Sequence, residues 1–316
     1  MTELETFASS AQRVVDYLRT HTPIADWSVS RIDGIAQVHL HVSGDPGGDG
    51  FLAVGARVPW TRTFCKRMLD GAPNIVAHAA LSPHYADLAH DHGVEAYAGV
   101  PIVDDDGTVF GTLCGVGVEP LDEADQIDGP LLDLFSDLLS AQLGLVRAAT
   151  QERRAALVTE AVANSDPLTG LMNRRGWDLV AADARHRVDA LGDHGAVLMI
   201  DLDGLKAVND EHGHQAGDLL LGSAADALRA AGSEHHAIAR LGGDEFAVYA
   251  EGVRPEQLAD LLEHYRAALR EAGVPGSVGA ASHYPVADGD GLTIALAEAD
   301  ARMYADKAER RSGIRR

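Results

Sequence analysis

Apolar residues near the start of the chain recur at helical spacing. Over residues 3–19 they fall at positions 4, 7, 11, 14, 15 and 18, which is the period of an amphipathic helix. Short apolar runs follow, separated by Asp33-Gly34 and by a glycine-rich stretch, and they predict strands at residues 27–32, 36–42 and 51–54. The pattern then predicts a helix at residues 61–69 and an extended segment at residues 74–77. Two further strands, at residues 97–103 and 108–118, form a hairpin.

A much longer helical pattern occupies residues 130–162. Its apolar positions are Leu131, Leu134, Phe135, Leu138, Leu145, Val146, Leu157, Val158, Ala161 and Val162. Only Gly144 weakens the pattern. Such a helix is either a solvated amphipathic helix packed on its own domain or a parallel coiled coil that joins two subunits. Because the stripe lies between two folded segments, we favour the coiled coil and expect a homodimer.

The second half of the chain alternates between helices and strands. Helices are predicted at residues 177–188, 219–231, 255–272 and 293–311, and strands at residues 196–202, 237–241, 246–249 and 276–282. The β-α-β-β-α-β order is that of a ferredoxin-like domain with additional elements. The predicted fold class is α+β, with an N-terminal sensor-like domain (residues 1–128), a helical linker (129–165) and a C-terminal ferredoxin-like domain (166–316).

Composition narrows the classes of partner. A formal net charge of −22 argues against binding a nucleic-acid backbone, although a nucleotide is allowed if metal ions and local cations neutralise its phosphates. No run of about 18 apolar residues is present, so we expect no membrane-spanning helix. The acidic N-terminus lacks the pattern of a secretory signal, and two cysteines give no disulfide framework. Together these features predict a cytoplasmic protein that binds neither membranes nor nucleic acids.

Chemistry-bearing residues gather around the string RLGGDEF at residues 240–246. Gly242 and Gly243 supply the positive φ of a two-residue hairpin turn, and Asp244 and Glu245 follow at once. Asp201 ends the apolar strand at residues 196–202. In a ferredoxin-like sheet these strands are neighbours, so we expect the carboxylates to converge. Two hard oxygen ligands together with phosphate oxygens suit Mg²⁺, or Mn²⁺ in its place.

With DPLTGLMNRRGW at residues 166–177, this string resembles the GGDEF family of diguanylate cyclases over about residues 166–311. The resemblance implies that two GTP molecules are condensed into cyclic di-GMP and two pyrophosphates by two facing subunits. It implies metal ligation by Asp201, Asp244 and the Leu202 carbonyl, and catalytic roles for Asp244, Glu245 and Lys206. The remaining implied residues bind substrate: Leu205, Asn209, His214, Asp218, Gly242, Gly243, Lys307 and Arg311.

Base recognition follows from the chemistry of guanine. Asn209 and Asp218 match the family positions that read it, and an acid accepts from guanine N–H groups that adenine lacks. Asn209 also suits a helix N-cap.

Several positions depart from the family pattern. Arg310 and Ser312 replace a glycine and an asparagine of the terminal motif, and Gly204 replaces a bulkier residue. The RxxD motif that binds product in many members is missing, because Ser233–His236 stands in its place. We therefore expect no product inhibition through that site.

Residues 58–69, 74–80 and 97–117 resemble GAF domains, a resemblance covering roughly residues 20–118. It implies a pocket over the sheet for a small molecule. His78, His84, His90 and His92 are either metal ligands or a polar surface loop, and the lack of tight Cys/His spacing favours the loop. Cys65 and Cys114 are either redox sensors or small buried hydrophobes, and we favour the latter. The sequence thus predicts a GAF-regulated diguanylate cyclase. The alternatives are a catalytically silent module that binds GTP or a cyclic dinucleotide, and a cyclase with an adenine-containing product, which Asp218 disfavours.

Overall fold

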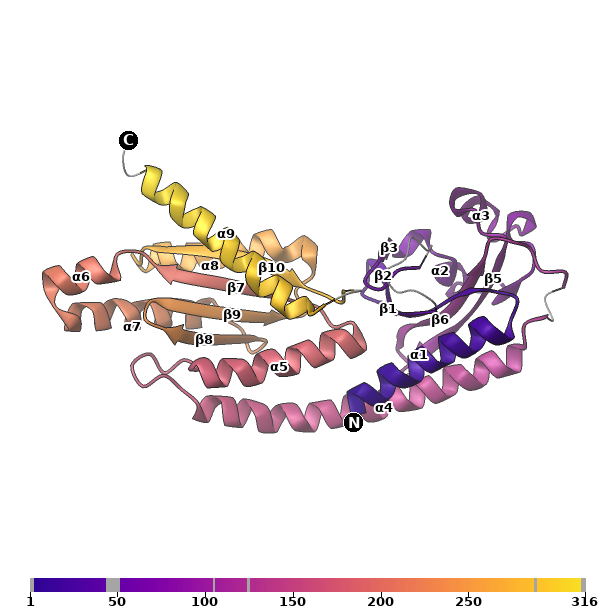
Figure 1. Ribbon diagram of the computed structural model, residues 1–316, viewed down its shortest axis with the longest axis horizontal. Helices are drawn as coiled ribbons and strands as arrows, with labels where there is room; N and C mark the ends of the chain where they lie inside the picture. Colours follow the sequence, from indigo (N-terminus) through magenta and orange to yellow (C-terminus); the bar gives the residue numbers. More distant parts are fainter. Residues whose placement is uncertain (1–2, 44–51, 105, 124–125, 287–288, 314–316) are drawn as a thin grey trace. The chain divides into compact units, whose positions relative to one another are not determined.

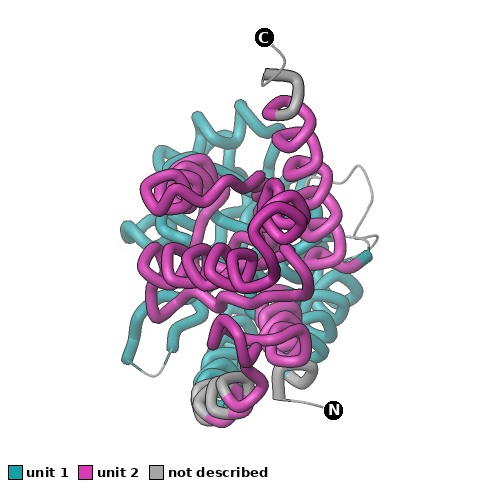
Figure 2. Tube along the Cα trace, turned by 90° about the vertical axis from the view of Figure 1, so that its left-hand side faces the viewer, with its two compact units in different colours: residues 1–151, 189–192, 285–289 teal, residues 152–188, 193–284, 290–316 magenta. Residues whose placement is uncertain are grey.

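The structure is a computed structural model of the 316-residue chain and describes residues 3–43, 52–104, 106–123, 126–286 and 289–313. Backbone contacts divide it into two compact units (Figure 2). Unit 1 comprises residues 1–151, 189–192 and 285–289, and unit 2 comprises residues 152–188, 193–284 and 290–316. Each unit has its own sheet and hydrophobic core, so each is described by itself.

Unit 1 is built around a six-stranded sheet of order β3-β2-β1-β6-β5-β4, in which every neighbouring pair is antiparallel (Figure 1). The strands are β1 (Asp26–Ile32), β2 (Ala36–Val42), β3 (Arg57–Pro59), β4 (Ile75–Val76), β5 (Ala96–Val103) and β6 (Val109–Gly117). The helices are α1 (Glu3–His21), α2 (Phe64–Leu69), α3 (Ala86–His92) and the first part of α4 (Gly129–Ala163), with 3₁₀ turns at Trp60–Arg62 and Ala79–Leu81.

One face of this sheet is covered by α1 and α4, which run alongside each other (Figure 1). Phe7, Ala11 and Val15 of α1 are fully buried, because a spacing of four residues brings them onto one side of the helix. Leu139 and Leu143 of α4 belong to the same core. The opposite face carries α2 and α3 with a separate core, in which Cys65 and Cys114 are both buried.

One strand prediction was wrong. Of residues 51–54, Phe51 lies outside the described residues, and residues 52–54 form a bend and a turn. The third strand is β3, further along the chain, and it pairs with β2. The apolar run cannot extend because the chain turns at Gly55, whose φ is +78° and whose N–H donates to the His39 carbonyl at 2.8 Å.

Helix α4 has 35 residues, as the long apolar pattern predicted. Its apolar residues form two stripes rather than one. Leu132, Leu139, Leu143 and Val146 are buried in unit 1, which is the packing expected of a helix on its own domain. The second stripe contains Leu134, Leu138 and Leu145, with 52%, 58% and 71% of their surfaces exposed. The side chains of Val158, Ala161 and Val162 lie outside those described.

Unit 2 contains a four-stranded antiparallel sheet of order β10-β7-β9-β8. The strands are β7 (Gly195–Leu202), β8 (His236–Gly242), β9 (Glu245–Glu251) and β10 (Gly276–His283). The helices are α5 (Arg174–Leu191), α6 (Leu205–His212), α7 (His214–Ala231), α8 (Leu258–Glu271) and α9 (Gly291–Gly313), and a 3₁₀ turn, Pro255–Gln257, precedes α8. The strand order and the β-α-β-β-α-β connections confirm the predicted ferredoxin-like core.

Two helix layers enclose this sheet. Leu221 and Leu228 of α7 pack with Tyr265 of α8 on one face. Trp177 of α5 and Ala299 of α9 belong to the core on the other face. Because both faces of the sheet are buried, the strands are nearly continuous apolar runs. Polar residues lie at the strand ends. No helix within the described ranges combines the length and the apolarity needed to cross a membrane.

Candidate active site

The glycine-containing hairpin lies between β8 and β9. Gly242 pairs with Glu245, so the two residues of the turn are Gly243 and Asp244. This corrects the expectation that Gly242 and Gly243 form the turn. A register shift between Arg240 and Gly242 displaces the turn by one residue. Gly243 has φ +53°, which a first turn position of type II′ favours and which glycine adopts at low cost.

Strand pairing brings the predicted acids to one end of the sheet. Asp201, the penultimate residue of β7, is in register with Glu245 of β9. The next residue, Leu202, donates its N–H to the Asp244 carbonyl at 3.1 Å. Asp201 is buried, with 7% of its surface exposed, whereas Asp244 and Glu245 are half-buried. Asp201 and Glu245 therefore lie opposite each other in paired strands, and Asp244 lies in the turn next to Glu245.

Lys307 joins this acidic end from α9. Its Nζ lies 2.5 Å from Asp201 Oδ1, and the exposed fractions of the two side chains are 17% and 10%. A buried carboxylate needs such a partner, because an isolated charge with so little solvent around it is unfavourable. The sequence placed Lys307 on the substrate phosphates and Asp201 on a metal ion, and it did not anticipate that the two residues pair with each other.

Asp306 holds this part of α9 against the sheet. Its Oδ2 accepts the Val278 N–H of β10 at 3.0 Å, and its carboxylate pairs with Arg266 of α8 at 3.1 Å. Arg310, which replaces the glycine of the family pattern, pairs with the same carboxylate at 3.3 Å. The substitution therefore adds a contact within α9. Arg311 belongs to α9, but its side chain lies outside those described.

The loop after β7 leads into α6, which carries Lys206 and Asn209. Gly204 precedes the helix with φ +82°, and Leu205 packs on the core of unit 2. Lys206 is exposed. Asn209 lies inside α6, so the interpretation of this residue as an N-cap was wrong.

Asn209 lies against Gly217 of α7. A Cβ added to Gly217 would come within 2.0 Å of Asn209 Oδ1, so a larger residue at position 217 would displace the Asn209 amide. The Oδ1 atom is buried and has no hydrogen-bond partner among the described residues. His214 and Asp218 belong to α7, as Gly217 does. Both are exposed, and they lie one turn apart on one face of the helix. Asp218 also lines a surface cavity with Leu168 and Leu219.

Sequence reasoning missed the role of Arg240. Its Nη2 and Nε donate to the Gly243 carbonyl at 2.8 and 3.1 Å, and its Nη1 lies 3.2 Å from Asp166 Oδ1. Asp166 in turn accepts from the backbone and hydroxyl of Thr169 at 2.9 and 2.8 Å. Burial would raise the pKa of Asp166, but the bonds from Thr169 and Arg240 lower it below its ordinary value. Arg240 therefore fixes the turn that carries Asp244 to the segment that follows α4.

The stretch in the position of the missing RxxD motif has a different chemistry. Ser233, Glu234 and His235 are exposed, and His236 begins β8 with its Nδ1 2.8 Å from the Tyr265 hydroxyl. Ser233 and Glu234 line a cavity with Arg229, whose Nη2 donates to the Thr169 carbonyl at 2.8 Å. In unit 1, His78, His84 and His90 are exposed, and the described residues contain no group of three or more His, Cys, Asp or Glu side chains placed to hold a metal.

A ferredoxin-like domain with acids at a hairpin tip and at the neighbouring strand end is the architecture of a nucleotidyl cyclase domain. Residues 163–313 match the family model described as diguanylate cyclase, GGDEF domain, and residues 7–143 match the GAF domain model. The chain belongs to the GGDEF family and combines that domain with a GAF domain, which confirms both resemblances.

Relatives agree with this assignment. Diguanylate cyclase DgcP of Escherichia coli is 26% identical over 272 residues, which cover 84% of this chain and 78% of that protein. An uncharacterized 19.3 kDa protein of Streptomyces ambofaciens is 40% identical over 164 residues, 49% of this chain and 84% of its own length. The solved sensory box/GGDEF family protein from Caulobacter crescentus is 36% identical, with a TM-score of 0.41 over 46% of this chain and 99% of its own. At the family level, the GGDEF family model and the match to diguanylate cyclase DgcP support synthesis of cyclic di-GMP.

Proposed function

We propose that this protein is a diguanylate cyclase that condenses two GTP molecules into cyclic di-GMP and two pyrophosphates. The observation that carries the proposal is the register of β7 and β9, which sets Asp201 beside the turn holding Asp244 and Glu245. In the proposed organisation, residues 1–128 form the GAF sensor, 129–165 the linker and 166–316 the catalytic domain.

The donor set of the site fits Mg²⁺ or Mn²⁺. Asp201 and Asp244 supply hard carboxylate oxygens, and the family resemblance adds the carbonyl of Leu202. Mg²⁺ favours such sparse protein ligation, because it keeps several waters and binds substrate phosphates. When bound, the ion neutralises phosphate charge and favours ionisation of the attacking hydroxyl. Lys307 pairs with Asp201 and so holds a cation where the phosphates arrive.

The chain's own residues divide the remaining work. Lys206, exposed at the start of α6, and Arg311 of α9 bind phosphate oxygens together with Lys307. Asp244 or Glu245 accepts the proton of the attacking 3′-hydroxyl. The bare backbone at Gly242 and Gly243 lets the nucleotide approach the turn, and Leu205 and His214 line its path. Asn209 binds the guanine edge, and the exposed Asp218 carboxylate accepts from the guanine N–H groups.

Each subunit binds one GTP, so catalysis requires a homodimer. The exposed apolar stripe of Leu134, Leu138 and Leu145 on α4 supports this proposal. Its residues are spaced by four and seven, which matches a heptad seam. The alternative is a silent module that binds GTP or a cyclic dinucleotide. One observation favours it: Asp201 forms an ion pair with Lys307. This ion pair competes with a metal ion for the Asp201 carboxylate.

Incubating the purified chain with GTP and Mg²⁺, followed by chromatography, separates the two functions. A cyclase yields one cyclic di-GMP for every two pyrophosphates, and a chelator stops the reaction. Saturable GTP binding without product would establish the silent module instead.

Asp218→Ser should relax selectivity for GTP over ATP, because it removes an acceptor for the guanine donors. Losing one such hydrogen bond costs about 1–3 kcal/mol, so the ratio of kcat/KM for the two nucleotides should fall about tenfold or more. Asp226→Ser, which changes another exposed acid lining the same cavity, is the matched control. Selectivity unchanged in Asp218→Ser would mean that the base is read elsewhere.

Arg240→Lys should lower kcat about tenfold, because lysine keeps the charge but not the planar fork that holds the Gly243 carbonyl and Asp166 together. The thermal midpoint and the KM for GTP should change little. Arg270→Lys, which alters an exposed pair with Glu263 on α8, is the control. An equal loss in both variants would refute a positioning role for Arg240.

A further inference from the structure

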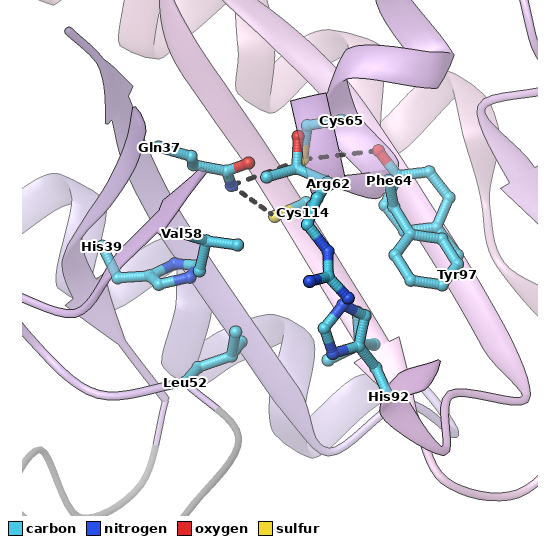
Figure 3. Close-up of a pocket in the computed structure, with 12 residues that line it drawn as sticks. Gln37, His39, Leu52, Val58, Arg62, Phe64, Cys65, His92, Tyr97 and Cys114 are labelled. Atoms are coloured by element: carbon cyan, nitrogen blue, oxygen red, sulfur yellow. Dashed lines mark hydrogen bonds between the residues drawn. The ribbon is translucent and has the colours of Figure 1, made fainter. Parts of the chain in front are cut away.

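A cavity in unit 1 brings the chain's two cysteines together. It has a volume of about 200 Å³ and lies on the α2–α3 face of the sheet (Figure 3). Cys65 enters it from α2 and Cys114 from β6, and both residues line its wall. The side-chain Nε2 of Gln37 lies 3.4 Å from the sulfur of Cys65 and 3.7 Å from that of Cys114. One amide group therefore bridges the two sulfur atoms.

The sulfur of Cys65 is surrounded by hydrogen-bond donors. Besides Gln37, the Thr112 hydroxyl donates to it at 3.2 Å and the Tyr97 hydroxyl at 3.6 Å. A neutral thiol is a weak acceptor, whereas three donors suit a thiolate. Burial alone would raise the pKa of Cys65, but hydrogen bonds from Cys114 and from these donors lower it to about 7. The donors therefore favour the nucleophilic thiolate form of Cys65.

Cys114 has the opposite character. Its hydrogen bond with Cys65, together with burial, raises its pKa well above the ordinary value, so it stays protonated. The Ser28 hydroxyl, at 3.6 Å, is a further neighbour of its sulfur. A thiolate beside a protonated thiol is the arrangement of an attacking and a resolving cysteine.

The cavity also offers a polar anchor for a small guest. Gln37 is 2% exposed, and its Oε1 is buried without a hydrogen-bond partner among the described residues. This acceptor lies on the same side chain that bridges the sulfurs. Figure 3 shows Arg62 and His92 beside each other in the cavity wall, so the guest meets polar groups there too.

We propose that Cys65 and Cys114 form a redox-active pair that reduces a hydroperoxide entering this cavity and closes into a disulfide. The Cys65 thiolate attacks the terminal peroxide oxygen, forming an S–O bond as the O–O bond breaks. The alkoxide or hydroxide released takes a proton from water. Cys114 sulfur then attacks Cys65 sulfur, and hydroxide leaves with the thiol proton as water. Two thiols lose two electrons in total, and the peroxide gains them.

Closure of the disulfide would couple the cavity to the rest of unit 1. It joins α2 covalently to β6, and it removes the thiolate to which Thr112, Tyr97 and Gln37 donate. This modification site goes beyond the proposed cyclase activity and does not depend on it, since its chemistry is measured on the thiols themselves.

The test uses the reduced full chain, which has two cysteines, and a limiting amount of hydrogen peroxide. Thiol titration of the denatured product should show both thiols lost together, with an intact mass lower by two hydrogen atoms and no covalent dimer. In Cys114→Ser, dimedone should label a sulfenic acid at Cys65. In Cys65→Ser, Cys114 should stay reduced. Oxidation no faster than in the guanidinium-unfolded chain would overturn the proposal, as would a disulfide between chains.

A matched pair of variants tests the role of the donors. Thr112→Val removes a donor to Cys65 at nearly constant volume and should slow oxidation at neutral pH by about tenfold, because the thiolate loses a charge-assisted bond. Ser28→Ala removes the hydroxyl beside Cys114 and should leave the first, Cys65 step unchanged. Equal rates in Thr112→Val and the parent chain would show that Cys65 is not activated by this cluster.

Discussion

Asp244→Asn should abolish cyclase turnover while leaving the fold intact. The amide keeps the size of the side chain but removes the negative charge of the Asp244 carboxylate, which is one of the two proposed metal ligands. The fold does not depend on this side chain, because the contact with Leu202 uses the Asp244 backbone carbonyl. A loss of about 4 kcal/mol of transition-state stabilisation lowers the rate about a thousandfold, so we expect at least this decrease in kcat.

Initial rates of cyclic di-GMP formation at saturating GTP and Mg²⁺ measure the effect. Asp260→Asn, an exposed acid at the start of α8, is the control and should retain the parental rate. Circular dichroism and the thermal midpoint should match the parent chain in both variants. Turnover by Asp244→Asn within a factor of about two of the parent would contradict the metal-ligand assignment.

Local patterns predicted most of the elements of unit 2. The apolar run before Asp201 gave β7 to within one residue, because a strand buried on both faces must be continuously apolar. The same reasoning failed at residues 52–54, where a short apolar run precedes Gly55. An apolar run of that length does not distinguish a strand from the buried part of a loop, and only pairing with β2 decides between them.

The positions of the acidic residues of the candidate site could be predicted from the sequence, but the ion pairs made by its basic residues could not. The acids are adjacent to strand ends, so the ferredoxin-like topology alone brings them together. The pairs Lys307–Asp201 and Arg240–Asp166 join residues 106 and 74 positions apart. They depend on how α9 and the segment after α4 pack on the sheet, and no local periodicity encodes such contacts. The one-residue displacement of the turn likewise follows from a bulge, which the sequence Gly-Gly does not specify.

Helix α4 shows how a single apolar pattern can serve two surfaces. The sequence offered either packing on its own domain or a coiled coil. The structure places Leu132, Leu139 and Leu143 in the core of unit 1, while Leu134 and Leu138 remain exposed. The second stripe therefore stays available to a partner subunit even though the helix is already packed, and the coiled-coil prediction rests on that stripe.

Inserting one residue after Gln151 should lower cyclase activity at least about tenfold, whereas inserting seven should largely restore it. One residue rotates the following part of a helix by about 100°, and a heptad nearly restores the original direction. Helix α4 continues from unit 1 into unit 2 without a break, so an insertion changes the phase of the catalytic domain relative to the exposed stripe. Reacting atoms must approach within about 3–3.5 Å, so facing GTP molecules tolerate little rotation.

Initial rates of variants with one, two, three, four and seven added alanines test this prediction, with sedimentation velocity measuring whether each variant is a dimer. Activity that oscillates with inserted length, with minima away from the heptad, identifies α4 as a rigid phase-setting element. A ligand or modification of the GAF unit then acts by favouring one phase, since it shifts the population only by its differential free energy for the two states. Activity that declines smoothly with length would make α4 a tether, and regulation would then require direct contact between the units.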